Sequence, residues 1–239
     1  MVVLAAAVLF AILAALGTWQ LNRLQWKNAM IAQVDTRTKL APAPAPSPDL
    51  WADLNHDDYE YLPVKVTGCF LHDKEAHIYT VLKRGKSAYF GSGFLVMTPL
   101  VTDEGWTVMV NRGFVPNKFR DPASRPAGSS PSPVTIEGLF RKNQSRNAFT
   151  PQDDLSKNIW YTRDPVKMAL NAGIASDRIA PFSIDAFASM TPPDGLPQAG
   201  QTRLHFPNNH LQYVLTWYGL ALALAGVVFA FVRSRRRQG

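Results

Sequence analysis

Residues 211–232 decide how this chain folds: they read LQYVLTWYGLALALAGVVFAFV and contain no Asp, Glu, Lys, Arg or His. A helix that spans the hydrocarbon core of a bilayer needs about 20 such residues. Residues 1–22, MVVLAAAVLFAILAALGTWQLN, form a second run with the same property, and all 18 acidic residues lie between the two runs. The sequence therefore predicts transmembrane helices at residues 1–22 and 208–232, on either side of a polar domain.

The positive charge is concentrated at the C-terminal end. The net charge is +7, and four arginines directly follow the second apolar run, at positions 233, 235, 236 and 237. Because a basic cluster beside a transmembrane segment marks a cytoplasmic end, we expect residues 233–239 to form a basic cytoplasmic tail. With two spans, both termini are then cytoplasmic, and the domain between them faces the bacterial periplasm or the equivalent intermembrane space.

The remaining charge does not indicate a nucleic-acid partner. Outside the arginine cluster the chain has 21 basic and 18 acidic residues, which is close to balance, so no nucleic acid is expected. One cysteine cannot form an internal disulfide, which excludes a secreted disulfide scaffold.

The first apolar run has a rival interpretation as a cleaved signal peptide. Such a peptide needs a basic segment before a shorter apolar core and a small-residue cleavage site. No Lys or Arg precedes this run, and no turn residue follows Gly17 before the helical pattern resumes. We therefore expect a membrane anchor.

Between the apolar runs the sequence pattern changes twice. Large side chains continue at helical spacing after the first run, at Trp19, Arg23, Trp26 and Met30. This spacing predicts an amphipathic helical stub over residues 23–40. Residues 41–48 read APAPAPSP, which predicts an extended Pro-rich linker that separates the stub from an extracytoplasmic domain at residues 49–207.

Within this domain the period becomes two. Val64, Val66 and Phe70 alternate with polar residues, and similar runs lie at residues 76–82, 89–100, 106–115, 134–140 and 182–187. Residues 164–172 predict one short helix, and residues 121–133, rich in Pro, Ser and Gly, predict a mobile surface loop. The expected fold class is therefore two transmembrane helices that flank a mainly antiparallel β (α+β) extracytoplasmic domain.

Motifs of enzymes are missing from the sequence. It contains no Gly-x-Ser-x-Gly elbow, no phosphate-binding loop, no His-Glu-x-x-His and no Cys-x-x-Cys. We therefore expect no catalytic residues and a protein that is not an enzyme; an outward-facing hydrolase is disfavoured because no nucleophile and base occur at a known spacing.

Three other groups of polar residues have ordinary structural explanations. The acidic cluster at residues 57–60 is typical of a solvated surface. His72 and His77, with Cys69 as a third member, could bracket a metal, but their spacing gives no ligand geometry. Arg112 could hold a carboxylate with its planar fork, and a structural salt bridge is the favoured alternative.

The most specific candidate site begins at His210. Asn208 and Asn209 are typical helix-start residues, so His210 lies in the first helical turn at the outer membrane surface, and it shares a helical face with Trp217 and with Tyr213 or Val214. A neutral imidazole beside aromatic side chains suits an axial haem ligand. The alternative is a boundary histidine that only solvates the helix end.

Other residues at this membrane depth could complete a haem site. Arg23, Lys27 and Arg203 are cations that would balance the two haem propionates, and Trp19 could pack on the ring.

Four motifs occur in the order found in a known family. They are LGTWQ (16–20) followed by Arg23, Trp26 and Lys27; VNRGFVP (110–116); GQTR (200–203); and NHLQY (209–213) followed by TWYG (216–219). With these motifs the chain resembles the surfeit locus protein 1 family from about residue 16 to residue 220.

This resemblance implies an assembly factor of cytochrome c oxidase. It implies transient binding of haem a, with His210 as the ligand of the haem iron, and insertion into the largest oxidase subunit. The implied partners are that subunit, haem a synthase and the lipid bilayer, and a homo-oligomer is left open. The alternative function is a protein-only scaffold that stabilises the nascent subunit without carrying haem. We expect the home of the protein to be a bacterial inner membrane, because no transit segment rich in Arg and Ser precedes the first run.

Overall fold

The structure is a computed structural model that describes residues 1–83, 88–129, 131–202, 204 and 206–238. The chain divides into two compact units. The helical unit comprises Met1–Asp35 and Arg203–Gly239, and the β-domain comprises Thr36–Thr202.

Two long helices form the helical unit. Helix α1 spans Val2–Arg37 and helix α4 spans His210–Gln238. At 1.5 Å per residue they are about 54 Å and about 44 Å long, so each exceeds the hydrocarbon core of about 30 Å. In each helix only 11% of the most apolar 18-residue window is buried, whereas the core helix of a soluble protein is mostly buried. These two helices confirm the expected membrane-spanning part of the fold.

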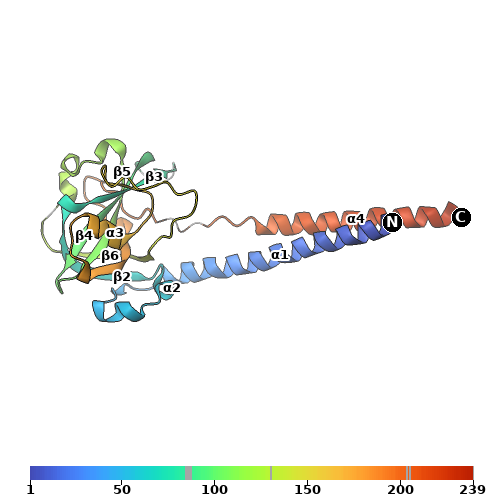
Figure 1. Cartoon of the computed structure of the whole chain (residues 1–239), viewed down its shortest axis with the longest axis horizontal. Helices are drawn as coiled ribbons and strands as arrows, with labels where there is room; N and C mark the ends of the chain where they lie inside the picture. Colours follow the sequence, from blue (N-terminus) through green and yellow to red (C-terminus); the bar gives the residue numbers. More distant parts are fainter. Residues whose placement is uncertain (84–87, 130, 203, 205, 239) are drawn as a thin grey trace. The chain divides into compact units, whose positions relative to one another are not determined.

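Residues on one stripe of each helix hold α1 against α4. Leu13, Gly17 and Gln20 are buried on α1, at spacings of four and three residues that place them on one face. A Cβ atom on Gly17 would lie 2.9 Å from the ring of Tyr218, so only glycine allows this approach. The Tyr218 hydroxyl lies 3.0 Å from Oγ1 of Thr18. The two helices run antiparallel, with both chain ends at the same end of the pair (Figure 1).

The β-domain is built on a closed sheet. Its strands are β1 (Ala43–Pro44), β2 (Pro63–Phe70), β3 (Ala76–Leu82), β4 (Gly91–Thr102), β5 (Thr107–Pro116), β6 (Val134–Lys142), β7 (Ile159–Trp160) and β8 (Ile179–Ala186). Their order is β1-β2-β6-β8-β5-β4-β3-β7, and a further pairing of β2 with β4 closes a barrel made of β2, β6, β8, β5 and β4.

Most neighbouring strands are antiparallel, as expected. The exception inside the barrel is β5 with β8, which run parallel with Val110 opposite Ile184. The two-residue strands β1 and β7 also pair in parallel, with β2 and β3 respectively. The fold class expected from the sequence is thus confirmed.

Apolar side chains fill the barrel and cover one outer face. The inner cluster draws on all five barrel strands and includes Val66, Leu100, Val110, Phe140 and Phe182. A second cluster packs the outer face against helix α3 (Pro165–Asn171) and contains Met97, Met109, Trp160 and Met168. Asp164 caps this helix, since its Oδ1 accepts the backbone N–H of Lys167 at 3.0 Å.

The Pro-rich segment at 41–48 is extended but is not a free spacer. Ala43 and Pro44 pair with β2, and the N–H of Ala45 donates to the carbonyl of Lys65 at 3.0 Å. The indole of Trp51 donates to the carbonyl of Pro46 at 2.9 Å. The segment therefore belongs to the β-domain, and α1 reaches Arg37 without a break.

The expectation of a mobile surface loop at residues 121–133 is wrong for the part from 121 to 129. Two short 3₁₀ helices, η4 (Pro122–Ser124) and η5 (Pro126–Gly128), lie here, and the side chain of Arg125 between them is only 1% exposed. A buried guanidinium anchors the segment, which composition alone did not reveal.

Candidate functional site

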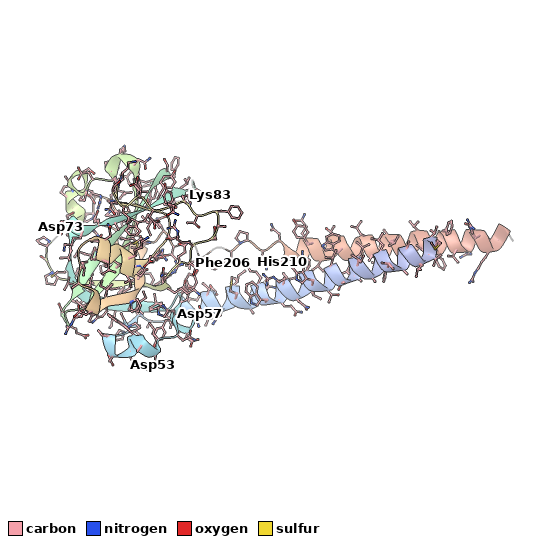
Figure 2. All side chains as sticks on the ribbon, in the orientation of Figure 1. Asp53, Asp57, Asp73, Lys83, Phe206 and His210 are labelled. Atoms are coloured by element: carbon pink, nitrogen blue, oxygen red, sulfur yellow. The ribbon has the colours of Figure 1, made fainter. Side chains whose placement is uncertain are left out.

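His210 is the first residue of α4 (Figure 2). Oδ1 of Asn208 accepts its backbone N–H at 3.4 Å, so the asparagine covers a helix-start donor. The side chain is partly buried. Its Nδ1 atom lies 2.7 Å from Oε1 of Gln20 on α1.

This contact favours one tautomer of the neutral imidazole. An amide oxygen only accepts hydrogen bonds, so the neutral ring that makes this bond carries its proton on Nδ1 and a lone pair on Nε2. Among the described residues none forms a hydrogen bond with Nε2. A hydrogen bond to one ring nitrogen that leaves the other nitrogen open is how proteins orient a metal-ligating histidine. In this arrangement Nε2 is the atom of His210 that could hold a metal.

Gln20 is the functional residue that sequence reasoning missed. It is 9% exposed, although Gln is seldom buried without a partner. Its signal in the sequence is its position seven residues after Leu13 and three after Gly17, on an otherwise apolar helical stripe. A polar side chain on the packed face of an anchor helix was the available clue.

The aromatic residues near His210 lie on different faces. Val214 is 7% exposed and lies on the buried face of α4. Of the two residues that the sequence left open, Val214 and Tyr213, Val214 is therefore the one on this face. Tyr213 and Trp19 are 50% and 55% exposed, and Trp217 is half-buried. Within the described part of the chain no ring contact joins His210 to these three aromatics. Their role in haem packing stays a prediction.

The predicted cations differ in how they are held. Nζ of Lys27 lies 5.2 Å from the ring centre of Phe206, in the segment that leads to His210. Arg23 is exposed and stacks on Trp26 of its own helix at 4.5 Å. Arg203, the third predicted cation, lies outside the described residues.

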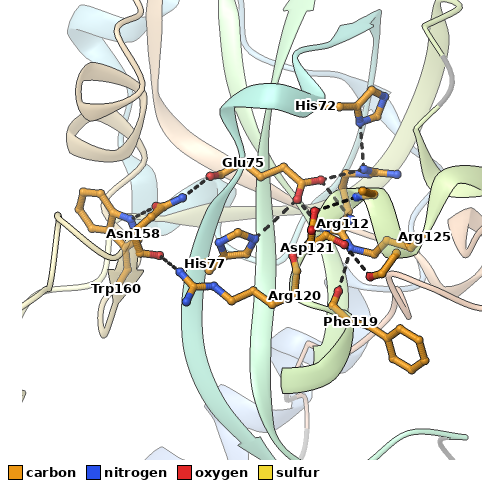
Figure 3. A network of polar contacts seen from close by, with 12 residues as sticks. His72, Glu75, His77, Arg112, Phe119, Arg120, Asp121, Arg125, Asn158 and Trp160 are labelled. Atoms are coloured by element: carbon orange, nitrogen blue, oxygen red, sulfur yellow. Dashed lines mark hydrogen bonds and ion pairs between the residues drawn. The ribbon is translucent and has the colours of Figure 1, made fainter.

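The β-domain holds a buried polar network centred on Glu75 (Figure 3). Arg125 donates two hydrogen bonds to this carboxylate, from Nη1 to Oε1 at 3.1 Å and from Nη2 to Oε2. Arg112 adds a longer contact of 3.4 Å, and Nε2 of His77 lies 3.6 Å from Oε2. Burial would raise the pKa of Glu75, but His77, Arg125 and Arg112 outweigh it and hold this pKa below its ordinary value.

This network gives Arg112 the structural salt bridge that was favoured, and it offers no metal site. Nδ1 of His72 lies 3.1 Å from Nη1 of Arg112. No group of three or more His, Cys, Asp or Glu residues that could hold a metal occurs within the residues the structure describes. The idea of a metal held by His72, His77 and Cys69 therefore receives no support.

A second buried carboxylate, Asp185, is bonded to residues from several segments of the β-domain. It accepts hydrogen bonds from Asn111 at 2.9 Å and from Thr202 at 2.8 Å. Arg141 and Arg163 pair with it at 2.8 Å and 3.1 Å. Thr202 is the last residue of the β-domain, so this cluster fixes the C-terminal end of the domain.

The acidic cluster at residues 57–60 is only in part a solvated surface. Asp57 is exposed and pairs with Lys142. Glu60 instead joins a half-buried network, with Arg141 at 3.0 Å and the N–H of Lys142 at 2.7 Å.

The fold and the site together define a class: a membrane protein with two antiparallel anchor helices, a histidine at the start of the second that is hydrogen-bonded to the first, and a β-barrel domain that separates the two helices in the sequence. The chain belongs to the SURF1 family, whose model matches residues 7–222. It is 38% identical over 225 residues to surfeit locus protein 1 of Homo sapiens, which covers 90% of this chain and 72% of the human protein. It is 40% identical over 231 residues to a SURF1-like protein of Monosiga brevicollis, covering 94% of this chain and 85% of that protein. A SURF1-like protein of Drosophila melanogaster is 34% identical over 220 residues, covering 87% and 70%.

Proposed function

We propose that this protein is a membrane-anchored assembly factor for haem–copper cytochrome c oxidase, which holds haem a as cargo at His210 and passes it to the largest oxidase subunit. The observation that carries the proposal is the hydrogen bond of 2.7 Å between Gln20 and Nδ1 of His210, which leaves Nε2 open. Membership of the SURF1 family supports the assembly role through the resemblance of the ordered motifs.

The residues around His210 suit a haem. Nε2 of His210 would ligate the iron, and Lys27 and Arg23, with Arg203, would balance the propionates. Trp19, Tyr213 and Trp217 expose apolar rings that would cover part of the macrocycle. One protein ligand makes a bond that is easily exchanged, which is what transfer to a recipient subunit requires.

The same proposal places the protein in a bacterial inner membrane, with both termini in the cytoplasm and the β-domain in the periplasm. Two features support this orientation. The antiparallel helices put both chain ends at one end of the pair (Figure 1), and the arginine cluster at 233–237 follows the second span. The β-domain would then dock on the nascent largest subunit, and haem a synthase would supply the cargo. We propose a carrier rather than an enzyme.

The absorption spectrum of the purified protein tests this function. The full chain is produced in cells that make haem a and in cells that do not, beside His210→Ala and the control Gln212→Ala. Gln212 is an exposed residue of the same helical turn region, so its loss leaves the hydrogen bond of Gln20 intact. We expect a haem spectrum only from haem-a-producing cells, retained in the Gln212 variant and lost in the His210 variant.

Oxidase assembly measured in the same cells separates the carrier from the protein-only scaffold. A carrier predicts that His210→Ala lowers the amount of haem a in the largest subunit. If assembly is normal in His210→Ala and is abolished only when the β-domain is disrupted, the scaffold is correct and the ligand role of His210 is wrong.

A further inference from the structure

A small cleft opens in the β-domain beside Arg112. Its volume is about 270 Å³, and it lies between the end of β2, the start of β6 and the chain on either side of Met190. Apolar side chains, among them Phe70, Ile136 and Met190, form most of the wall. Arg112, His72 and Ser132 form its polar part.

The polar part lies beside two buried guanidinium groups that pair with one carboxylate. Arg112 and Arg125 share one carboxylate, that of Glu75, and all three residues are buried, with exposures of 8%, 1% and 6%. The charge of a second carboxylate, Asp194, also acts on Arg112, but the ion pairs of the described residues join Arg112 to Glu75. Burial lowers the pKa of Arg112 to about 10, and the charge of Arg125 adds to the shift, while the charges of Glu75 and Asp194 oppose it. A buried charge without its full complement of partners is costly, and an anion would relieve that cost.

The two guanidinium groups differ in how fully their donors are used. Arg125 holds both oxygens of Glu75, and its Nε donates to a backbone carbonyl at 3.1 Å. Arg112 makes one bond of 3.4 Å to Glu75. Its other bonds go to Nδ1 of His72 at 3.1 Å and to the carbonyl of Gly128. Among the described residues, none accepts a hydrogen bond from Nε of Arg112. The guanidinium that lines the cleft is thus the one with an open donor.

The plane of this guanidinium is also held in place. The Cζ atom of Arg112 lies 4.9 Å from the ring centre of Phe70, a stacking contact on the apolar wall. A fixed planar fork beside an apolar pocket is suited to a carboxylate that carries an apolar group.

We propose that the cleft binds the C-terminal carboxylate of a partner protein whose last side chain is apolar, with Arg112 holding the carboxylate. The open Nε donor of Arg112 suits a carboxylate oxygen. Pockets for drug-sized ligands occupy about 300 to 1,000 Å³, so a cleft of about 270 Å³ admits one terminal residue rather than a longer segment. Capture of a chain end in this way is a known mode of peptide recognition.

Calorimetric titration of the full-length protein in detergent micelles tests the proposal. The probes are the tripeptide N-acetyl-Ala-Ala-Leu with a free carboxylate, the same tripeptide as its C-terminal amide, and isobutyrate as a small free acid. We expect the free-acid peptide to bind about tenfold or more tightly than the amide, because charge-assisted hydrogen bonds to the guanidinium are lost in the amide. Isobutyrate should bind more weakly than the free-acid peptide, since it lacks the peptide backbone.

Two variants report on the site, and the first of them leaves every residue of the Glu75 network unchanged. Met190→Glu places a negative charge on the wall and should lower the affinity for the free-acid peptide about tenfold. The control Leu155→Glu changes a partly exposed residue outside the cleft and should leave this affinity unchanged. Arg112→Lys keeps the charge but loses the planar fork and should also weaken binding. Equal affinity for acid and amide, equal affinity in Met190→Glu, or no binding of the free acid at millimolar concentration overturns the proposal. The titration involves no haem, so its failure leaves the carrier function untouched.

Discussion

Gln20 and His210 form the pair on which the proposed chemistry depends. A buried amide oxygen 2.7 Å from Nδ1 selects the imidazole tautomer with a free Nε2. Removal of such a hydrogen-bond partner from a metal-ligating histidine lowers metal affinity by about 10–100-fold. The two residues are 190 positions apart in the sequence, so this hydrogen bond joins the two anchor helices.

We predict that Gln20→Leu removes the preference of His210 for the tautomer that is protonated on Nδ1. In the wild type, ¹⁵N chemical shifts of labelled histidine should show a protonated Nδ1 and an unprotonated Nε2, and in Gln20→Leu the two tautomers should mix. Haem retention should fall by about 10–100-fold for the same reason. Gln25→Leu, an exposed position on the same helix, is the matched control. An unchanged tautomer in Gln20→Leu would show that the glutamine plays no positioning role.

At the scale of elements, the packing of α1 on α4 depends on the absence of a side chain at Gly17. A Cβ atom there would lie 2.9 Å from the Tyr218 ring, too close for a real contact. Gln20 follows on the same buried stripe, so we expect the separation of the helices at Gly17 to affect the hydrogen bond to His210.

Gly17→Leu should therefore push the helices apart. Overpacking of this kind costs about 1–3 kcal/mol, and it should shift the His210 tautomer as Gln20→Leu does, although Gln20 is still present. Ala15→Leu adds the same side chain at an exposed position of α1 and should leave the histidine spectrum unchanged. Identical histidine spectra in Gly17→Leu and the wild type would mean that the contact of the helices at Gly17 does not govern the site.

The segment from 121 to 129 depends in the same way on Arg125. Its guanidinium is bound to Glu75, to the carbonyl of Phe119 and to the carbonyl of Arg120, and it is 1% exposed. Removal of one partner from a buried ion pair costs about 3–5 kcal/mol.

We predict that Arg125→Met lowers the unfolding temperature of the β-domain and opens residues 121–129 to limited proteolysis. The exposed neighbour Lys118, changed to Met, should do neither. Resistance of Arg125→Met to protease at this segment would mean that the 3₁₀ helices hold without the buried cation.

The sequence allowed good prediction of the elements and a weaker prediction of their contacts. Long runs with period two or with helical apolarity marked the longer strands and the anchors, because burial of one face imposes those periods. The strands β1 and β7 have two residues each and carry no period. Closure of the barrel by β2 with β4 follows from pairing across the fold, which local patterns do not encode.

The same limit explains the sites. His210 stood out because it begins an apolar run, which is a local signal. Its partner Gln20 and the burial of Arg125 arise from contacts between distant segments, and composition pointed the other way in the Pro-rich stretch around Arg125. Buried polar pairs are thus the part of this fold that single-sequence reasoning reached least.

At the scale of the whole molecule, the two units differ in how they should respond to acid. Asp35 is the only acidic residue in the helical unit, and the other 17 of the 18 lie in the β-domain. Two of those carboxylates, Glu75 and Asp185, are buried among arginines. Burial would raise the pKa of Asp185, but Arg163 and Arg141, with hydrogen bonds from Asn111 and Thr202, hold it below its ordinary value.

Lowered pKa values of Glu75 and Asp185 mean that the folded β-domain binds fewer protons than the unfolded chain. The stability from both clusters is therefore complete above the ordinary pKa values of 4.5 and 3.8 and is lost as pH falls below them toward the folded-state values.

We predict that acid unfolds the β-domain while α1 and α4 stay helical. Emission from the buried Trp106 and Trp160 should shift to longer wavelength as pH falls below about 4, while far-ultraviolet circular dichroism keeps its helical signal. Loss of both signals in one transition would show that the two units unfold together, and an unchanged emission down to pH of about 2 would show that the two carboxylates contribute nothing to stability.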